Sequence, residues 1–329
     1  MTQNVLLGIY ILELLQKNAS MTHKMTQEQL LYYLDRDYNI CITRKTLSGY
    51  LHLLREEGYI TGNRGVYSNN YFSDTELRLL IDGVLFGQHV PKKNAQILID
   101  KLKGLSNDSM KNRIKHIHYL EGIRHTDNFE LYSILDSLDN AIEQKRKVEI
   151  TQCTYNVNGQ LVDRHVSIVS PYYIVASRSM YYLICYAGRF DDVENRRIDR
   201  ISAVNVLNEK AIDLRDIGNY KQCPFNLAGY MKEHIYMFSG NSEWITMQVD
   251  KNAIGEVIDW YGKEYQIIRE TEKSVVIRMY ANSNAAYYWA LQYGAKVEIL
   301  KPLTLRNRIK EGLMDMIQKY QIMIVYQQD

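Results

Sequence analysis

Residues 43–67 read TRKTLSGYLHLLREEGYITGNRGVY, and this stretch decides the fold of the N-terminal part of the chain. Thr43 is a typical helix N-cap, leucines recur every three or four residues after it, and Gly58 is a typical C-terminal stop. Two β-prone pairs then flank a glycine-containing turn at residues 61–65. The stretch therefore predicts an amphipathic helix followed at once by a small β-hairpin.

Two more helices are predicted upstream of this stretch. Apolar residues recur at helical spacing over residues 4–17, and Thr26 precedes Gln29 as in a capping box that opens a second helix. Three helices followed by a hairpin form the layout of a winged helix-turn-helix, which we assign to residues 1–72.

A helical connector is predicted for residues 73–146. Ser73 and Glu76 form another capping box, and the helical pattern is interrupted near Pro91 and Gly104. The last helix of this connector is expected to run from about Asn128 to Arg146.

The hydropathy pattern becomes alternating over residues 147–215, which predicts β-structure. A strand at residues 148–152 leads towards Asn158-Gly159, a strong hairpin signal, and its partner strand should continue to about Val169. Further short strands are expected at residues 172–176, 181–186 and 196–207. Together they predict a small, mostly antiparallel sheet or barrel.

Residues 216–239 are predicted to form a linker with a short helix, and residues 240–329 a last domain. Its expected strands are 244–249, 265–268, 274–279 and 297–300, and its expected helices are 253–261, 284–292 and 303–320. The resulting order β-α-β-β-α-β is ferredoxin-like. The fold class expected for the whole chain is therefore a multidomain α+β protein.

Composition limits the classes of protein that need to be considered. The 329 residues suffice for two or three domains, and 40 Lys and Arg against 38 Asp and Glu give a net charge of +2, so a nucleic-acid surface must be a local patch. The four cysteines form no CxxC pair, and no signal peptide or apolar run of about 20 residues is seen. We expect a cytoplasmic protein without a membrane partner.

Polar residues on the outer face of the predicted third helix are candidates for contact with duplex DNA. The first turn of such a helix enters the major groove, where Arg reads guanine and Ser or Thr contact bases or phosphates. The candidates, with one arginine at the hairpin tip, are Thr43, Arg44, Lys45, Thr46, Ser48, His52 and Arg64. The alternative is a helical bundle with solvated charges, but the hairpin favours a winged helix.

A second group of cationic and aromatic residues lies in the predicted middle sheet, at Tyr181-Tyr182-Leu183 and at residues 196–201, which read RRIDRI. In one continuous strand, Arg196 and Arg200 share a face and Arg197 points to the other. Arg donates bidentate hydrogen bonds to phosphate, and Tyr rings offer a stacking surface for a base. The alternative is a solvated sheet edge on which the arginines pair with Asp191, Asp192, Glu194 or Asp199.

These motifs resemble the WYL-domain family. Tyr181-Tyr182-Leu183 falls where that family has Trp-Tyr-Leu, and residues 197–201 match its Arg-x-Asp-Arg-Ile motif, with Ser170-Pro171 upstream. Residues 289–306 resemble the extension that follows WYL domains, and Thr43-Arg44-Lys45-Thr46 resembles the winged-helix domain that members often carry. This sequence departs from the family pattern in having Tyr for Trp at 181 and, at 196, Arg in place of the usual aromatic residue.

The resemblance implies a small Sm-like β-domain in a bacterial transcription regulator that is commonly homodimeric. It also implies that this domain binds an anionic effector, a nucleotide or single-stranded nucleic acid. The effector-contact candidates are Tyr182, Arg197 and Arg200, with Tyr181, Arg196 and His165 as additions. Arg197 and Arg200 can serve one ligand only where a bulge, strand end or turn intervenes near Asp199, so which of Arg196 and Arg197 faces the ligand stays open.

Motifs of the common enzyme classes are missing: the sequence has no Gly-x-Ser-x-Gly, HExxH, Walker loop or dinucleotide-binding glycine motif. His116 and His118 would share a face only in a strand, and they fall in the predicted helical connector. We therefore expect no catalytic residue, metal or cofactor.

The function expected from the sequence is a homodimeric DNA-binding repressor gated by an anionic effector. The alternative is a WYL accessory protein that binds RNA or single-stranded DNA and modulates a nucleic-acid-processing or phage-defence enzyme. A hydrolytic enzyme of unknown type is a third hypothesis. An outward groove-reading row on the third helix favours the first.

Overall fold

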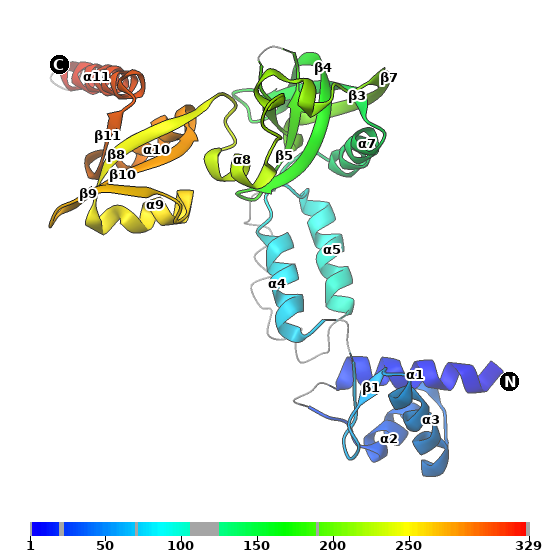
Figure 1. Cartoon of the computed structure of the whole chain (residues 1–329). Helices are drawn as coiled ribbons and strands as arrows, with labels where there is room; N and C mark the ends of the chain where they lie inside the picture. The colour runs from blue at the N-terminus through cyan, green and yellow to red at the C-terminus, as the bar shows by residue number, and fades with distance from the viewer. Residues whose placement is uncertain (1, 20–22, 70–71, 106–124, 189–190, 327–329) are drawn as a thin grey trace. The chain divides into compact units, whose positions relative to one another are not determined.

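The computed structural model describes residues 2–19, 23–69, 72–105, 125–188 and 191–326 (Figure 1). The chain divides into two compact units, residues 1–129 and 130–329, and each unit is considered by itself. The predicted connector, residues 73–146, extends across that division.

The first unit begins with three helices and a hairpin, as the sequence predicts. These elements are α1 (Thr2–Asn18), α2 (Gln27–Tyr38), α3 (Arg44–Glu56), β1 (Ile60–Thr61) and β2 (Tyr67–Ser68). The capping box of α2 is formed: the Gln29 amide donates to Thr26 Oγ1 over 3.2 Å, and the Thr26 amide donates to Gln29 Oε1 over 2.8 Å. Thr43 caps α3 through its side chain. The helix starts are therefore set by local side-chain chemistry.

Apolar side chains from all three helices and the hairpin form one core. Its fully buried members include Ile11, Leu15, Leu30, Leu34, Leu47 and Leu51. The hairpin turn depends on Gly62, which has a φ of 102° and would place a Cβ atom 2.0 Å from the Gly65 carbonyl oxygen. Met25 adds a bridge to Val66 beside the hairpin, which the sequence did not indicate.

Two further helices, α4 (Asp74–Leu85) and α5 (Lys92–Gly104), lie side by side (Figure 1). Leu77, Ile81, Leu85 and Ile99 are buried between them. The capping box at Ser73 opens α4 as predicted.

The second unit begins with α7 (Leu131–Glu143), which packs on a five-stranded sheet. The strands are β3 (Arg146–Tyr155), β4 (Leu161–Ser177), β5 (Met180–Tyr186), β6 (Glu194–Arg197) and β7 (Ile201–Lys210). The predicted helix to Arg146 is too long, because Lys145 has a left-handed φ of 52° and Arg146 already begins β3. Leu131, Ile134 and Leu138 bury the inner face of α7 against the sheet.

Strand β4 is longer than expected. It runs through Pro171 with a register shift at Pro171 to Tyr173, so the two strands predicted at either side of this proline are one. The loop between β3 and β4, residues 156–160, is longer than the two-residue turn predicted at Asn158-Gly159. Within it, Asn156 Oδ1 accepts hydrogen bonds from the amides of Asn158 and Gln160.

The predicted strand 196–207 is wrong, because a turn of 3-10 helix, η2 (Ile198–Arg200), separates β6 from β7. The sheet order is β6-β5-β4-β3-β7, so these consecutive strands lie at opposite edges. Four inter-strand steps in a flat sheet span roughly 19 Å, whereas the chain from Arg197 to Ile201 reaches at most about 14 Å. The sheet must therefore curl until its edges approach each other.

A connecting segment with η3 (Leu214–Asp216), η4 (Gly218–Tyr220) and α8 (Leu227–Glu233) leads to a second, four-stranded sheet. Its strands and helices are β8 (Ser242–Asp250), α9 (Ile254–Tyr261), β9 (Gln266–Glu270), β10 (Ser274–Asn282), α10 (Ser283–Tyr293), β11 (Val297–Lys301) and α11 (Leu303–Tyr326), with η5 (Lys251–Ala253) and η6 (Gly294–Lys296) as short links. The strand order is β11-β8-β10-β9, and every pair is antiparallel. The predicted succession of strands and helices is therefore present.

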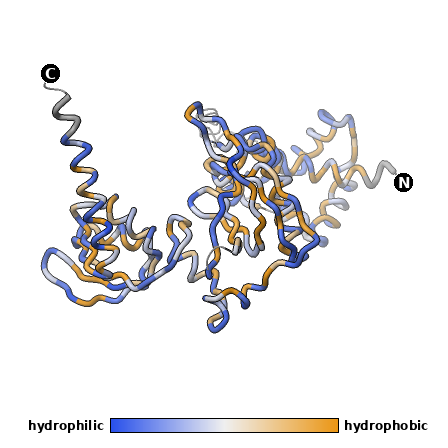
Figure 2. Tube along the Cα trace, turned by 90° about the horizontal axis from the view of Figure 1, so that it is seen from above, coloured by the Kyte–Doolittle hydropathy of each residue, from blue (hydrophilic) through white to orange (hydrophobic). Residues whose placement is uncertain are grey.

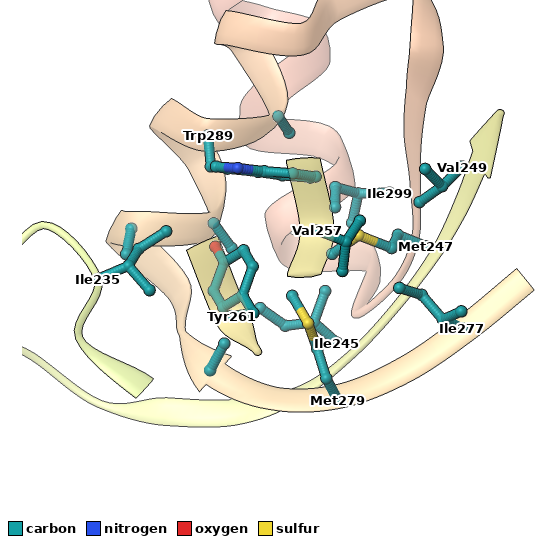
Figure 3. Packing of buried hydrophobic residues seen from close by; sticks show 14 of the residues in the cluster. Ile235, Ile245, Met247, Val249, Val257, Tyr261, Ile277, Met279, Trp289 and Ile299 are labelled. Atoms are coloured by element: carbon teal, nitrogen blue, oxygen red, sulfur yellow. The ribbon is translucent and has the colours of Figure 1, made fainter. Parts of the chain in front are cut away.

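The core of this part is centred on Trp289, which packs edge-on against Tyr261 with ring centroids 5.4 Å apart (Figure 3). Ile245, Met247 and Val257 surround the two rings. The helices are thus fixed on one face of the sheet by large buried side chains.

The last helix, α11, carries hydrophobic residues interspersed with hydrophilic ones (Figure 2). Its side chains Leu313, Met314 and Ile317 are exposed. None of the described helices is both long and apolar enough to cross a membrane.

Replacing Trp289 with Ala should lower the free energy of unfolding of the C-terminal part by about 3–5 kcal/mol, because a fully buried aromatic side chain leaves a cavity. The exposed Trp244 is the matched control, and its replacement with Ala should cost about 1 kcal/mol. All three tryptophans of the chain lie in this part, so denaturant unfolding can be followed by the fluorescence of the remaining two. Equal losses would contradict the central role of Trp289.

Candidate functional site

The N-terminal end of α3 presents polar side chains to solvent. Thr43 Oγ1 accepts a hydrogen bond from the Thr46 amide over 3.2 Å, and the two threonine hydroxyls lie 2.9 Å apart. Leu47 and Leu51 are buried on the opposite face. Both threonines therefore organise the start of the helix.

The four other predicted contact residues of α3, Arg44, Lys45, Ser48 and His52, are all exposed. Arg44 Nε donates to Gln27 Oε1 of α2 over 3.2 Å, which ties one side of the guanidinium to the neighbouring helix. His52 Nε2 lies 3.4 Å from Glu56 Oε1 one turn later. The first turn of α3 thus offers two cations and a hydroxyl on one accessible surface.

Arg64 is exposed in the turn between β1 and β2. This turn is held by Arg55 at the end of α3, whose Nε and Nη2 donate to the Gly62 carbonyl over 3.2 and 2.8 Å. The sequence analysis missed Arg55, although a basic residue in the last turn of a helix is a general signal for bonding nearby carbonyls.

The β5–β6 pairing sorts the predicted effector residues onto two faces of the sheet. Tyr182 lies opposite Arg197, and Leu183 lies opposite Arg196. Directly opposed residues in antiparallel strands share a face, and neighbours along a strand alternate. Arg196 therefore shares a face with the buried Leu183, and Arg197 shares the other with Tyr182.

Arg196 belongs to a polar cluster inside the curled sheet. It pairs with Glu194, and its Nη1 donates to Gln152 Oε1 over 2.7 Å. Burial raises the pKa of the neighbouring Cys185 thiol to about 12, partly offset by the charge of Arg196. The Arg196 side chain is only 14% exposed, so its role here is to neutralise a buried carboxylate.

Two more of the predicted residues lie on the Arg196 face. His165 lies opposite Gln152 in the β3–β4 pairing, and Gln152 is the residue that Arg196 contacts. Tyr181 packs against the hydrophobic core that contains Leu183 and the buried residues of α7. The structure thus brings His165, Tyr181 and Arg196 to one side of the sheet and does not join them to Tyr182.

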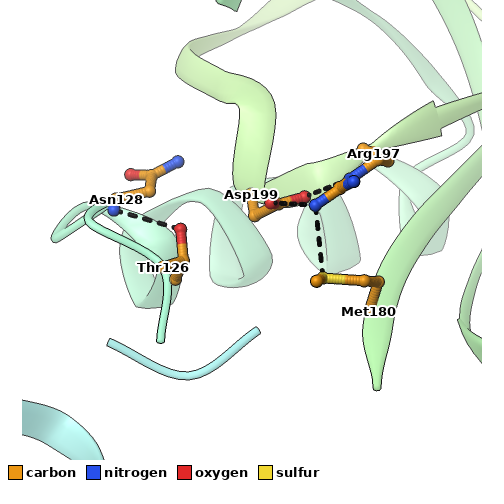
Figure 4. A network of polar contacts seen from close by, with 5 residues as sticks. All are labelled: Thr126, Asn128, Met180, Arg197 and Asp199. Carbon is orange, nitrogen blue, oxygen red and sulfur yellow. Dashed lines mark hydrogen bonds and ion pairs between the residues drawn. The ribbon is translucent and has the colours of Figure 1, made fainter. Parts of the chain in front are cut away.

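Arg197 forms a bidentate ion pair with Asp199 (Figure 4). Its Nε and Nη2 donate to the two carboxylate oxygens over 3.0 and 2.6 Å, and Nη2 also lies 3.3 Å from Met180 Sδ. Burial is the largest single effect and lowers the pKa of Arg197, but the hydrogen bonds to Asp199 and the charge of Asp199 together outweigh it, so the pKa is raised. The Asp199 side chain is 3% exposed, so its charge depends on this partner.

Arg200 lies at the end of η2 and has a different environment. Its guanidinium carbon is 5.8 Å from the centre of the Tyr155 ring, at the end of β3. Its Nε is buried, and no described residue accepts a hydrogen bond from it. Within the described part of the chain, Arg200 also has no carboxylate partner. Its donors therefore stay available.

Tyr182 completes this group. Burial raises the pKa of its hydroxyl, while the nearby charges of Arg197 and Arg200 act in the opposite direction. Arg200 can donate charge-assisted hydrogen bonds to an anion, and the tyrosine rings can contact a planar group. The sequence analysis missed Tyr155, which as an isolated tyrosine at a strand end has no motif around it.

The histidines considered as metal ligands, His116 and His118, lie outside the described residues. Among the residues that are described, no group of three or more His, Cys, Asp or Glu side chains is arranged to hold a metal ion.

The fold and these residues define a multidomain α+β protein with a helical N-terminal unit and two antiparallel sheets. The WYL domain family matches residues 133–206, and the WCX domain family matches residues 241–317. The chain therefore contains a WYL domain and, C-terminal to it, a WCX domain. No curated protein matches it.

Solved structures similar to this chain include the proteasome accessory factor B/C (PafBC) of Arthrobacter aurescens, with 15% identity and a TM-score of 0.30. That match covers 88% of this chain and 48% of the other, so this chain spans about half the length of PafBC. A CRISPR Cas-related protein matches with 13% identity and a TM-score of 0.41, over 98% of this chain and 86% of the other.

Replacing Arg197 with Met should destabilise the second unit by about 3–5 kcal/mol, because it leaves the buried Asp199 carboxylate without its bidentate partner. Arg200→Met is the matched control and should change stability by less than about 1 kcal/mol, since it breaks no ion pair. Urea unfolding followed by circular dichroism measures both. Adding Asp199→Asn to Arg197→Met should recover part of the loss, and equal losses for the two arginines would contradict this division of roles.

Proposed function

We propose that this protein is a bacterial transcription regulator, a homodimeric repressor that binds duplex DNA and is gated by a nucleotide or single-stranded nucleic acid. The observation that carries the proposal is the exposed row Arg44, Lys45 and Ser48 at the start of α3, next to a hairpin that carries the exposed Arg64. The WYL and WCX domains support it, because the resemblance implies this class of regulator.

The three helices and hairpin of residues 1–72 are interpreted as the winged helix-turn-helix. In such domains the N-terminal residues of the recognition helix contact base edges. Arg44 and Lys45 occupy the first turn of α3, and the Arg55 contact with Gly62 stiffens the hairpin that would act as the wing. Thr43 and Thr46 would contact phosphates while they cap the helix, and His52 would lie at the edge of the interface.

The remaining boundaries are proposed from the same reasoning: a connector at residues 73–146, the WYL domain at 147–215, a linker at 216–239 and the extension domain at 240–329. The curled five-stranded sheet supports an Sm-like description of the WYL domain. The β-α-β-β-α-β succession with order β11-β8-β10-β9 supports a ferredoxin-like description of the last domain.

The proposed effector site consists of Arg200, Tyr182 and Tyr155, with Arg197 held at its side by Asp199. A phosphate would accept hydrogen bonds from Arg200, and a base would contact a tyrosine ring. Arg196, Tyr181 and His165 would shape the sheet behind it. The proposed function includes no catalytic activity and no cofactor.

The DNA-binding part is tested with Arg44→Ala. It should lose about 1–3 kcal/mol of binding free energy at a specific site selected from genomic fragments, and much less on random duplex. Arg78→Ala on α4, an exposed arginine outside residues 1–72, should bind as the unaltered protein does. Fluorescence anisotropy measures affinity, and footprinting should reveal two half-sites about one helical turn apart. Absence of any duplex binding by the intact protein at low salt would refute the regulator.

The effector part is tested with Arg200→Ala. This variant should keep its operator affinity but lose the response to single-stranded oligonucleotides or nucleotides, because the donors at η2 are removed. Arg164→Ala, an exposed arginine on β4, is the matched control and should respond normally. The readout is operator anisotropy with increasing oligonucleotide. A response that survives in Arg200→Ala would place the effector elsewhere.

A further inference from the structure

A pocket with acidic and aromatic walls lies at the junction of the two sheets of the second unit. Its volume is about 530 Å³, in the range of small-molecule sites. It is lined by the loop before β6, by η4 and α8, and by the strands β8 and β10. Its walls therefore come from both the WYL and the WCX regions.

Aromatic rings form much of this pocket. Tyr220 and Phe225 meet edge to face with centroids 5.1 Å apart, and Tyr230 lies 5.3 Å from Phe225. Tyr280 on β10 lines the other side and is 46% exposed. The faces of such rings carry negative electrostatic potential and attract cations.

The charged side chains of the pocket are both acidic. Asp192 Oδ1 accepts hydrogen bonds from the Tyr220 hydroxyl and from the Val193 amide. Glu233 at the end of α8 is half-buried, and no residue in the described ranges donates a hydrogen bond to it or pairs with it. No lysine or arginine is among the lining residues that are described.

The buried ring of His234 also lines the pocket. Burial lowers the pKa of the His234 ring, whereas its hydrogen bonds with backbone carbonyl groups act in the opposite direction. Its Nδ1 atom lies 2.9 Å from the carbonyl oxygen of Tyr230. Burial and the charges of Glu233 and Asp192 raise the pKa of the Tyr280 hydroxyl, so both carboxylates act on the same ring. Ser242 adds a buried Oγ without a partner among the described residues.

We propose that this pocket binds a small organic cation with a guanidinium or primary ammonium group. The cationic group would lie between the Glu233 carboxylate and the face of a tyrosine, and the hydrocarbon part would pack on Phe225. A phosphate-bearing effector is repelled here by two carboxylates, so this pocket and the Arg200 site select ligands of opposite charge.

The probe for the test is n-butylguanidinium, titrated into the full-length protein by isothermal calorimetry without DNA. n-Butylurea has nearly the same shape without the charge and serves as the ligand control. The guanidinium compound should bind at least roughly tenfold more tightly, and its affinity should fall as salt is raised. Equal binding of the two compounds, or binding of neither, would overturn the proposal.

Two substitutions locate the binding. Glu233→Gln keeps the side-chain shape and should weaken n-butylguanidinium binding roughly tenfold, and Tyr280→Leu should weaken it roughly fivefold. Glu272→Gln, an exposed carboxylate in the β9–β10 turn, should leave the affinity unchanged. Circular dichroism melting verifies that each variant is folded. Equal weakening by Glu233→Gln and Glu272→Gln would show a general charge effect and refute the site, and neither result depends on DNA binding.

Discussion

The turn Ile198–Arg200 is the constraint on which the second unit depends. It joins strands at opposite edges of a five-stranded sheet, so the sheet can form only if it curls and the turn is held in place. Ile198 does this by burial in the core with α7, and Asp199 does it through the ion pair with Arg197. A buried carboxylate is tolerated only with such a partner, and the pair therefore fixes the geometry of the turn.

The same turn separates the roles of three arginines that are close in sequence. Arg196 neutralises Glu194 inside the sheet and Arg197 neutralises Asp199, whereas Arg200 is the last residue of the turn and has no carboxylate partner among the described residues. Two of the three arginines are thus paired with carboxylates within the domain. The cationic character available to a ligand is concentrated at Arg200.

Features set by neighbouring residues could be predicted from the sequence. The caps at Thr26, Thr43 and Ser73 depend on groups three residues away, and the strand and helix succession after residue 240 follows from local hydropathy periods. The break at η2 was predicted only as one possibility near Asp199, although Ile198 and Ile201 lie three residues apart with two polar residues between them, which departs from strict alternation.

Long-range contacts could not be predicted from the sequence for a different reason. Arg196 meets Gln152 from β3, and the pocket combines Asp192 with Tyr280, so both depend on how distant segments come together. A continuous strand would have paired Arg196 with Arg200. The register of β5 with β6 and the turn after Arg197 place Arg196 on the opposite face from Tyr182.

Strand β6 connects the two sites of the second unit. Asp192 precedes it, Arg197 ends it, and four residues of strand span only about 13 Å. Between them, the Asn195 amide donates to Ser239 Oγ over 2.9 Å and its side chain donates to the Tyr230 hydroxyl over 2.8 Å, so β6 is fastened to the segment that forms the pocket.

A ligand at one site changes affinity at the other only if it binds two arrangements of β6 with different affinity. Such coupling is reciprocal, so a cation that altered effector binding would have its own affinity altered by the same factor. The close packing around β6 favours discrete arrangements over gradual bending, because protein interiors have little free volume. The affinities of two ligands of opposite charge would then both depend on the arrangement of the single short strand β6.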